Sequence, residues 1–126
     1  MTQATQIRNT TTIAVVDDDE SVRTALDSLL RSTGYKVRTY RSAIEFLDAN
    51  APVSTHCLIS DIQMPGMSGV ELHEQLGAMG FRIPTIFITA YPDLGAHTPG
   101  LVACLPKPCD ADKLLDCIET ALGPAH

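Results

Sequence analysis

Short apolar segments alternate with longer segments of helical periodicity along the chain. Four of the short segments are almost wholly apolar and one alternates apolar with polar residues; in chain order they are residues 13–16, 35–40, 57–60, 86–88 and 101–105. Apolar runs of this length are typical of strands buried on both faces, whereas Lys36 and Arg38 are expected to point outward from the alternating strand. Five strands separated by helices predict an α/β fold with a parallel sheet and right-handed crossovers.

The ends of the helical segments carry capping signals. Ser42 and Ser68 are each followed three residues later by a glutamate, the spacing of a capping box, which marks the beginning of a helix. Asp110 is the candidate N-cap of a last helix, and Gly34 stands where a left-handed residue would end the first one. The apolar faces of these first and last helices are formed by Val22, Ala25, Leu26, Leu29 and Leu30, and by Leu114, Cys117, Ile118, Ala121 and Leu122.

Length and charge restrict the class of protein. With 126 residues the chain has the length of one domain, taken here as residues 1–126 with a polar extension over residues 1–11 and a core over residues 12–122. A net charge of −6 disfavours direct contact with nucleic acid, because such binding depends on Lys and Arg neutralising phosphates. No apolar run approaches the roughly 20 residues of a membrane span, and the first residues lack the apolar centre of a signal peptide. We therefore expect a cytoplasmic protein without a membrane partner.

The cysteines and histidines show no spacing typical of metal ligands. The four cysteines are Cys57, Cys104, Cys109 and Cys117, and the four histidines are His56, His73, His97 and His126. Because no Cys-x-x-Cys or Cys/His pair has the spacing of metal ligands, reduced structural thiols are favoured over the alternatives of a disulfide or a zinc site. The histidines are expected on the surface or on polar faces.

The candidate chemistry lies at the ends of four of the predicted strands. These ends carry Asp17 and Asp18 after the first strand, Asp61 after the third, Thr89 at the end of the fourth and Lys107 after the fifth. Ligands of an open parallel sheet lie outside the carboxyl ends of its strands, so these side chains are expected to converge on one crevice. Carboxylates at this density favour a hard divalent cation such as Mg²⁺, together with phosphate oxygens and water.

Each of these residues also has a plainer interpretation when taken alone. Asp61 can be a strand-end aspartate that caps a turn, Thr89 a β-branched strand residue and Lys107 a solvated lysine. Their combination at neighbouring strand ends favours a reactive site over these separate structural roles. A carboxylate is a poor nucleophile toward an anionic phosphoryl donor, and a metal ion that bridges the two groups removes much of their repulsion. Prolines on both sides of Lys107 restrict its backbone, as expected where an ammonium has to meet an anion.

These motifs, in this order, resemble the receiver domain of two-component response regulators. The resemblance extends over residues 12–122 and is most specific in residues 60–69, SDIQMPGMSG, and in the Lys107-Pro108 pair. It implies a flavodoxin-like (βα)5 fold, a doubly wound five-stranded parallel sheet with strand order 2-1-3-4-5. It also implies that Asp61 accepts a phosphoryl group from a histidine kinase or a histidine phosphotransfer protein.

The resemblance assigns a metal site to the acidic residues. Asp17 and Asp18 would hold Mg²⁺, or Mn²⁺ in its place, together with Asp61 and the backbone carbonyl of Gln63. Within the acidic run we expect Asp18 to bind the ion directly. Asp17 is expected to bind it through a water molecule or to contact the groups that bind it. Asp19 and the glutamate after it are expected to remain solvated or to stabilise the N-terminus of the first helix.

The last two strands carry two matches to the family and two departures from it. Thr89 and Lys107 match the hydroxyl and the lysine that read the phosphoryl group, and the Lys107-Pro108 bond is expected to be cis. Cys104 stands three residues before the lysine, where the family has a switching aromatic residue or histidine. Residues 91–100 hold two prolines and two glycines where the family has its fourth helix, so we expect that helix to be shortened, irregular or mobile.

The predicted function is that of a stand-alone phospho-accepting switch, a regulatory domain rather than an enzyme. We expect it to act by contact on a downstream protein of unknown identity or to pass phosphate along a relay. An alternative is a haloacid-dehalogenase-like phosphatase with Asp17 as nucleophile and Asp19 as acid, although the later acidic pair of that fold is missing. A flavodoxin-like cofactor binder is a third interpretation, but no glycine-rich phosphate loop follows the first strand.

Overall fold

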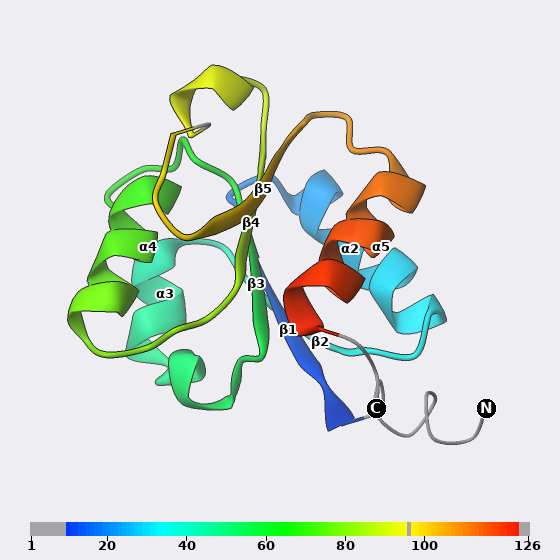
Figure 1. Cartoon of the computed structure of the whole chain (residues 1–126), viewed down its shortest axis with the longest axis horizontal. Helices are drawn as coiled ribbons and strands as arrows, with labels where there is room; N and C mark the ends of the chain where they lie inside the picture. Colours follow the sequence, from blue (N-terminus) through cyan, green and yellow to red (C-terminus); the bar gives the residue numbers. More distant parts are fainter. Residues whose placement is uncertain (1–9, 96, 124–126) are drawn as a thin grey trace.

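A five-stranded parallel sheet forms the centre of the molecule (Figure 1). The computed structural model describes residues 10–95 and 97–123, so Ala96, His126 and most of the predicted extension over residues 1–11 lie outside the described residues. The strands are β1 (Thr12–Val16), β2 (Lys36–Tyr40), β3 (Cys57–Ser60), β4 (Thr85–Thr89) and β5 (Leu101–Pro106), in the order β2-β1-β3-β4-β5. The strands, their parallel pairing and their order confirm the predicted doubly wound α/β fold.

Four α-helices within the described residues cover the two faces of the sheet. They are α2 (Glu20–Ser32), α3 (Ala43–Asp48), α4 (Gly69–Ala78) and α5 (Ala111–Leu122), and two short 3₁₀ helices, η1 (Ala51–Ser54) and η2 (Pro92–Leu94), accompany them. Figure 1 shows α2 and α5 on one face of the sheet and α3 and α4 on the other. None of the helices in this part of the chain has the length and apolarity needed to cross a membrane.

The pleat of the strands divides the hydrophobic core into two clusters, one on each face. Ile13 and Val15 of β1 belong to the cluster that packs with α2 and α5, whereas Ala14 and Val16 of the same strand pack on the other face with α3 and α4. All four side chains are 0 % exposed. A strand buried on both faces has no position for a polar side chain, which explains why this strand reads as a continuous apolar run in the sequence.

The predicted capping residues are confirmed. The side chains that accept backbone N–H groups at the helix beginnings are those of Asp19, Ser42, Ser68 and Asp110. Ser68 and Glu71 form a complete capping box. At the beginning of α3 the carboxylate of Glu45 instead accepts from the N–H of Arg41, one residue before the N-cap. Gly34 has a φ of 100°, the left-handed conformation expected after α2.

The segment between β4 and β5 does not form a regular helix. Its described residues contain only the three-residue η2, so the predicted shortening of the fourth helix is confirmed. Gly95 packs there so closely that a Cβ atom would lie 2.6 Å from Ile62 Cδ1 and 2.7 Å from Phe87 Cδ2. Every residue of β4 is buried, whereas no residue of β5 is fully buried. The reduced helix therefore leaves the edge strand β5 partly open.

All four cysteines are free thiols, as predicted. Burial raises the pKa of Cys57 to about 12. Burial is also the main reason why the pKa values of Cys104, Cys109 and Cys117 are raised, with nearby acidic groups adding to the effect. Thiols with raised pKa values are weak nucleophiles at neutral pH, which agrees with a structural role.

Gly69, the first residue of α4, lies against the backbone of Asp61. A Cβ atom at this position would overlap the carbonyl oxygen of Asp61 and lie 3.1 Å from the Cα of Ile62. We expect Gly69→Ala to lower the free energy of unfolding by about 1–3 kcal/mol, because the backbone has to shift. Gly77→Ala in the same helix, where a Cβ meets nothing within 4 Å, should raise it by about 0.5–1 kcal/mol. Urea unfolding of both variants measures the difference, and equal stabilities would contradict the predicted overlap.

Candidate functional site

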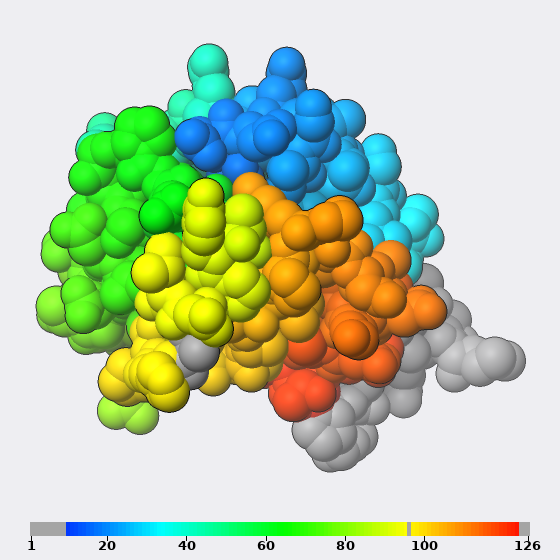
Figure 2. Space-filling view, turned by 90° about the horizontal axis from the view of Figure 1, so that it is seen from above, coloured from blue at the N-terminus to red at the C-terminus, as the bar shows by residue number. Residues whose placement is uncertain are grey.

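Four strand ends bring the predicted site residues together at one edge of the sheet. Asp17 follows β1, Asp61 follows β3, Thr89 ends β4 and Lys107 follows β5. Figure 2 looks onto this edge and shows the four segments meeting on one face of the molecule. The convergence expected for the carboxyl ends of parallel strands is therefore present.

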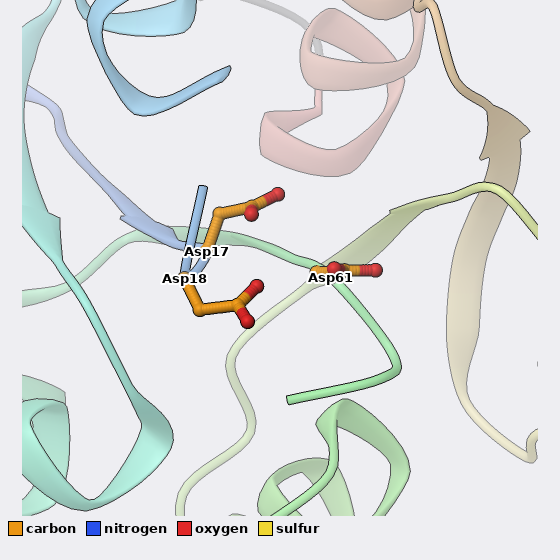
Figure 3. Close-up of side chains that lie close together, drawn as sticks. All are labelled: Asp17, Asp18 and Asp61. Atoms are coloured by element: carbon orange, nitrogen blue, oxygen red, sulfur yellow. The ribbon is translucent and has the colours of Figure 1, made fainter. Parts of the chain in front are cut away.

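Three carboxylates lie at the centre of the site. One oxygen each from Asp17, Asp18 and Asp61 lies within 4.8 Å of the others. Figure 3 shows Asp17 and Asp18 where the chain leaves β1, with their carboxylates on the side of Asp61. A set of carboxylate oxygens fits a hard divalent cation such as Mg²⁺, and the cluster contains none of the thiolate or imidazole ligands that are typical of zinc sites.

Lys107 reaches the carboxylates from the end of β5. Its Nζ lies 2.9 Å from Oδ2 of Asp17 and 3.2 Å from Oδ2 of Asp61. The backbone N–H of Lys107 donates to the carbonyl oxygen of Thr89 at 2.9 Å, which anchors the lysine beside β4. The peptide bond to Pro108 is cis, as expected. One ammonium offsets only part of the charge of three carboxylates, so the site remains negative and attracts cations.

Burial and charge shift the pKa values of Asp17 and Lys107. Burial raises the pKa of Asp17, and the backbone N–H of Asp19 and the ammonium of Lys107 offset this only in part, while Asp61 adds to the rise. Burial alone would lower the pKa of Lys107, but hydrogen bonds and charges from Asp17 and Asp61 outweigh it, so that this pKa is raised. The lysine is therefore firmly protonated, whereas the ionised form of Asp17 is held at a free-energy cost.

Asp61 has a partner at each carboxylate oxygen. The backbone N–H of Ile62 donates to Oδ1 at 2.7 Å, and Lys107 contacts Oδ2. The backbone N–H of Asp61 donates to the carbonyl oxygen of Val16 at 3.0 Å, which extends the pairing of β3 with β1 by one residue. The residue Asp61 is only 8 % exposed. Its carboxylate is thus fixed in orientation at the edge of the sheet.

Thr89 connects this edge to the irregular segment that follows β4. The residue is 1 % exposed, and its hydroxyl oxygen accepts from the backbone N–H of Tyr91 at 3.1 Å. Tyr91 is 58 % exposed and lies at the surface. A displacement of the Thr89 hydroxyl would therefore disturb this hydrogen bond and with it the backbone of the next segment.

Asp18, Asp19 and Gln63 are exposed, unlike Asp17. Asp19 is the N-cap of α2, and its Oδ1 accepts from two backbone N–H groups of the first turn at 2.8 and 3.3 Å. The expected stabilisation of the helix N-terminus by Asp19 is confirmed. Gln63 lies two residues after Asp61 in the loop before α4, and the role of its carbonyl stays a prediction.

Two contacts of the irregular segment had no signal in the sequence. Cys104 Sγ donates to the carbonyl oxygen of Pro92 at 3.2 Å. Nε2 of His73 in α4 lies 2.8 Å from the carbonyl oxygen of Pro99, and because a carbonyl only accepts, this nitrogen donates. Nδ1 of His73 lies 3.2 Å from Oγ1 of Thr85. His73, expected only to occupy a polar face, thus links α4 to both β4 and the segment before β5.

Comparison with known proteins gives a family match over most of the chain. The model of the response regulator receiver domain family matches residues 13–119. The transcriptional regulatory protein TdiR of Thauera aromatica is 41 % identical over 125 residues, which cover 96 % of this chain and 55 % of TdiR. The chain therefore spans about half the length of this relative.

Solved structures share the fold. The response regulator StyR has a TM-score of 0.82 and 47 % identity, covering 90 % of this chain and 59 % of that one. The response regulator TrrA of Thermotoga maritima, whose structure is described as a complex with Mg²⁺ and BeF, has a TM-score of 0.81 and 26 % identity, covering 89 % of this chain and 99 % of that one.

Lys107→Met removes the positive charge that faces Asp17. In metal-free buffer near pH 7 we expect it to lower the free energy of unfolding by about 2–3 kcal/mol, because a buried carboxylate loses its partner. The pKa of Asp17 in the folded protein is raised, so its ionisation weakens the folded state as the pH rises above the ordinary value of 3.8. Without Lys107 this pKa rises further, and the cost of the substitution should shrink as the pH falls toward about 4.

Chemical denaturation near pH 7 and near pH 4 measures this cost. Lys113→Met, at an exposed position of α5, is the matched control and should change the free energy of unfolding by less than about 0.5 kcal/mol at both pH values. A cost of Lys107→Met that does not depend on pH would contradict the role of the Asp17 pair.

Proposed function

The chain belongs to the response regulator receiver domain family, and on this premise we propose that it accepts a phosphoryl group on Asp61 and signals through the resulting change of its surface. The family is regulatory and its members are phospho-accepting switches. The assignment to Asp61 rests on its position: its carboxylate lies beside the acidic pair that follows β1 and also contacts the ammonium of Lys107.

The surroundings of Asp61 support a transfer step at its carboxylate. One carboxylate oxygen forms a bond to phosphorus while the bond between phosphorus and the leaving atom of the donor breaks, and that atom keeps the electron pair. The N–H of Ile62 holds Oδ1 and so keeps the carboxylate plane in place. Lys107 then exchanges its contact with Asp61 for one with a phosphoryl oxygen, a change that its flexible side chain allows. The hydroxyl of Thr89 donates to a second phosphoryl oxygen.

We propose Mg²⁺ as the cation of the site, with Mn²⁺ as a substitute. When bound, the ion would neutralise the charges that otherwise keep the carboxylate and the phosphoryl group apart. Asp18, exposed and beside Asp61, suits direct contact, whereas Asp17 is paired with Lys107 and suits contact through water. The backbone carbonyl of Gln63 would complete the protein ligands. The Mg²⁺ named in the TrrA complex supports this choice.

We propose a histidine kinase or a histidine phosphotransfer protein as the phosphoryl donor, and an unidentified protein as the downstream partner. The expectation of no direct contact with nucleic acid is left without support, because the relative TdiR is a transcriptional regulatory protein of which the matched region is about half. The stand-alone organisation over residues 1–126 and the cytoplasmic location stay predictions.

The haloacid-dehalogenase-like alternative is not supported. It needs Asp19 as a catalytic acid, but the carboxylate of Asp19 caps α2, and the family match over residues 13–119 is to receiver domains. We propose instead that the chain is a regulatory domain and not an enzyme. Its residues would assist only their own phosphorylation and the slow loss of the phosphoryl group.

We propose residues 91–100 as the element that responds to phosphorylation. Cys104 lacks the aromatic ring that switches in the family, and the described residues of this segment form only one 3₁₀ turn. Thr89 and Cys104 hold the segment near its beginning, and His73 holds it near its end. A movement of the Thr89 hydroxyl toward a phosphoryl oxygen would break its hydrogen bond to the segment. Coupling between phosphorylation and the signalling surface is typically worth about 1–3 kcal/mol, and it needs an element that has two such arrangements.

Asp61→Asn should abolish phosphorylation, because an amide oxygen is not a nucleophile of comparable strength. Incubation with a small phosphodonor and Mg²⁺, followed by intact mass measurement, should show one added phosphoryl group on the wild type and none on the variant. Asp19→Asn is the matched control and should label as fully as the wild type, since asparagine is an equally good N-cap. Full labelling of Asp61→Asn would move the site elsewhere.

Backbone amide exchange tests the proposed switching segment. With Mg²⁺ and beryllofluoride as a phosphoryl mimic, protection of the amides in residues 91–100 should change by about tenfold, which corresponds to about 1.4 kcal/mol. Thr89→Val keeps the β-branched shape but lacks the hydroxyl, and it should reduce this response. Equal protection of the segment with and without the mimic in the wild type would refute its role.

A further inference from the structure

Arg23 in α2 makes a contact with the acidic turn that the proposed phosphorylation chemistry does not use. Its Nη1 donates to the carbonyl oxygen of Asp17 at 2.7 Å. Its backbone N–H donates to the carbonyl oxygen of Asp19 at 3.1 Å. Arg23 is therefore bonded to both ends of the turn formed by residues 17–19, from the helix that follows this turn.

The carbonyl that Arg23 holds belongs to the peptide unit joining Asp17 to Asp18. The orientation of this unit determines where the Cα of Asp18 lies and hence where its carboxylate can reach. Other bonds hold Asp17, whose N–H donates to the carbonyl oxygen of Tyr40 at 3.1 Å and whose Oδ1 accepts from the N–H of Asp19 at 2.9 Å. Asp18 is exposed, so packing does little to fix its direction. The guanidinium is thus well placed to orient it.

We propose that Arg23 is a positioning residue for the metal site, and this inference rests on the proposed function. Through its bond to the Asp17 carbonyl it would hold Asp18 where its carboxylate meets those of Asp17 and Asp61. Its charge acts in the opposite direction, because a guanidinium near the site repels a divalent cation. The two effects of its removal on Mg²⁺ affinity therefore have opposite signs, and the proposal requires that the loss of positioning outweighs the loss of repulsion, so that the affinity falls.

A polar groove beside Arg23 limits the size of the expected effect. The groove has a volume of about 280 Å³, and its lining includes Arg23, Asp27, Arg41 and Glu45. Water from this groove can reach the Asp17 carbonyl when the arginine is truncated, and it can replace one hydrogen bond. It cannot replace the rigid connection to α2, so we expect a moderate loss of affinity rather than an abolished site.

Arg31 on the same helix provides a matched control. Its Nη2 donates to the carbonyl oxygen of Val37 at 2.7 Å, a bond of the same kind, length and sequence separation as that of Arg23. It also pairs with Asp27 at 2.7 Å. Eight residues separate the two arginines, which is about 12 Å along the helix, so Arg31→Ala removes the same charge and bond well away from the acidic turn.

Mg²⁺ titrations of the wild type, Arg23→Ala, Arg23→Lys, Arg31→Ala and Asp18→Ala test the inference. We expect Arg23→Ala to weaken Mg²⁺ binding about three- to tenfold, although it removes a positive charge. Arg23→Lys keeps a donor on a long side chain and should recover most of the loss, whereas Arg31→Ala should remain within about twofold of the wild type. Asp18→Ala, which removes a proposed ligand, should lose tenfold or more and sets the scale.

Amide exchange without metal gives a second measurement that does not depend on Mg²⁺. In Arg23→Ala the amides of Asp18 and Asp19 should exchange several-fold faster, while those in Arg31→Ala should not change. Unchanged or tighter Mg²⁺ binding by Arg23→Ala, or an equal loss in Arg31→Ala, overturns the positioning role and leaves the proposed function intact. A wild type that binds no Mg²⁺ overturns the proposed function, and this inference with it.

Discussion

Repulsion among three carboxylates within 4.8 Å of one another is the constraint on which this edge of the protein depends. Burial is the main reason why the ionised form of Asp17 is disfavoured, and the like charge of Asp61 adds to the cost. Nearby groups offset it in part: Lys107 pairs with Asp17 and Asp61, and the backbone N–H groups of Asp19 and Ile62 each donate to a carboxylate oxygen. The negative charge that remains makes the binding of a divalent cation favourable, because a cation reverses the mutual effect of the carboxylates.

The parallel sheet assembles this cluster, and the sequence predicts that part of the molecule well. Strands such as β1 are buried on both faces, so their apolar runs and the points where these runs end can be recognised in the sequence. Asp17, Asp61, Thr89 and Lys107 stand at those points. Because parallel strands end at a common edge, their convergence follows from the order of the elements without knowledge of any contact.

Contacts with backbone carbonyls could not be predicted in the same way. The side chains of Arg23, His73 and Cys104 each donate to a carbonyl oxygen. Every residue carries a carbonyl, so no residue type marks the acceptor, and the pairing depends on how separate elements and loops pack together. The close approach of Gly69 to Asp61 has the same origin, since it exists only once α4 has packed beside the loop after β3. Sequence patterns specify these elements but not the distances between them.

The irregular segment between β4 and β5 shows how such local contacts bear on signalling. A full helix there would bury apolar surface, and each Å² buried would stabilise the helix in its place by about 25 cal/mol. Displacing such a helix would therefore cost much free energy. The described part of this segment contains only η2. Gly95, which has no side chain, packs against Ile62 and Phe87, and the polar contacts that hold the segment contribute about 1 kcal/mol each. The free-energy difference between two arrangements of such a segment is therefore small enough for one phosphoryl group to bias. We infer that a weakly held segment can replace the switching aromatic that Cys104 does not provide.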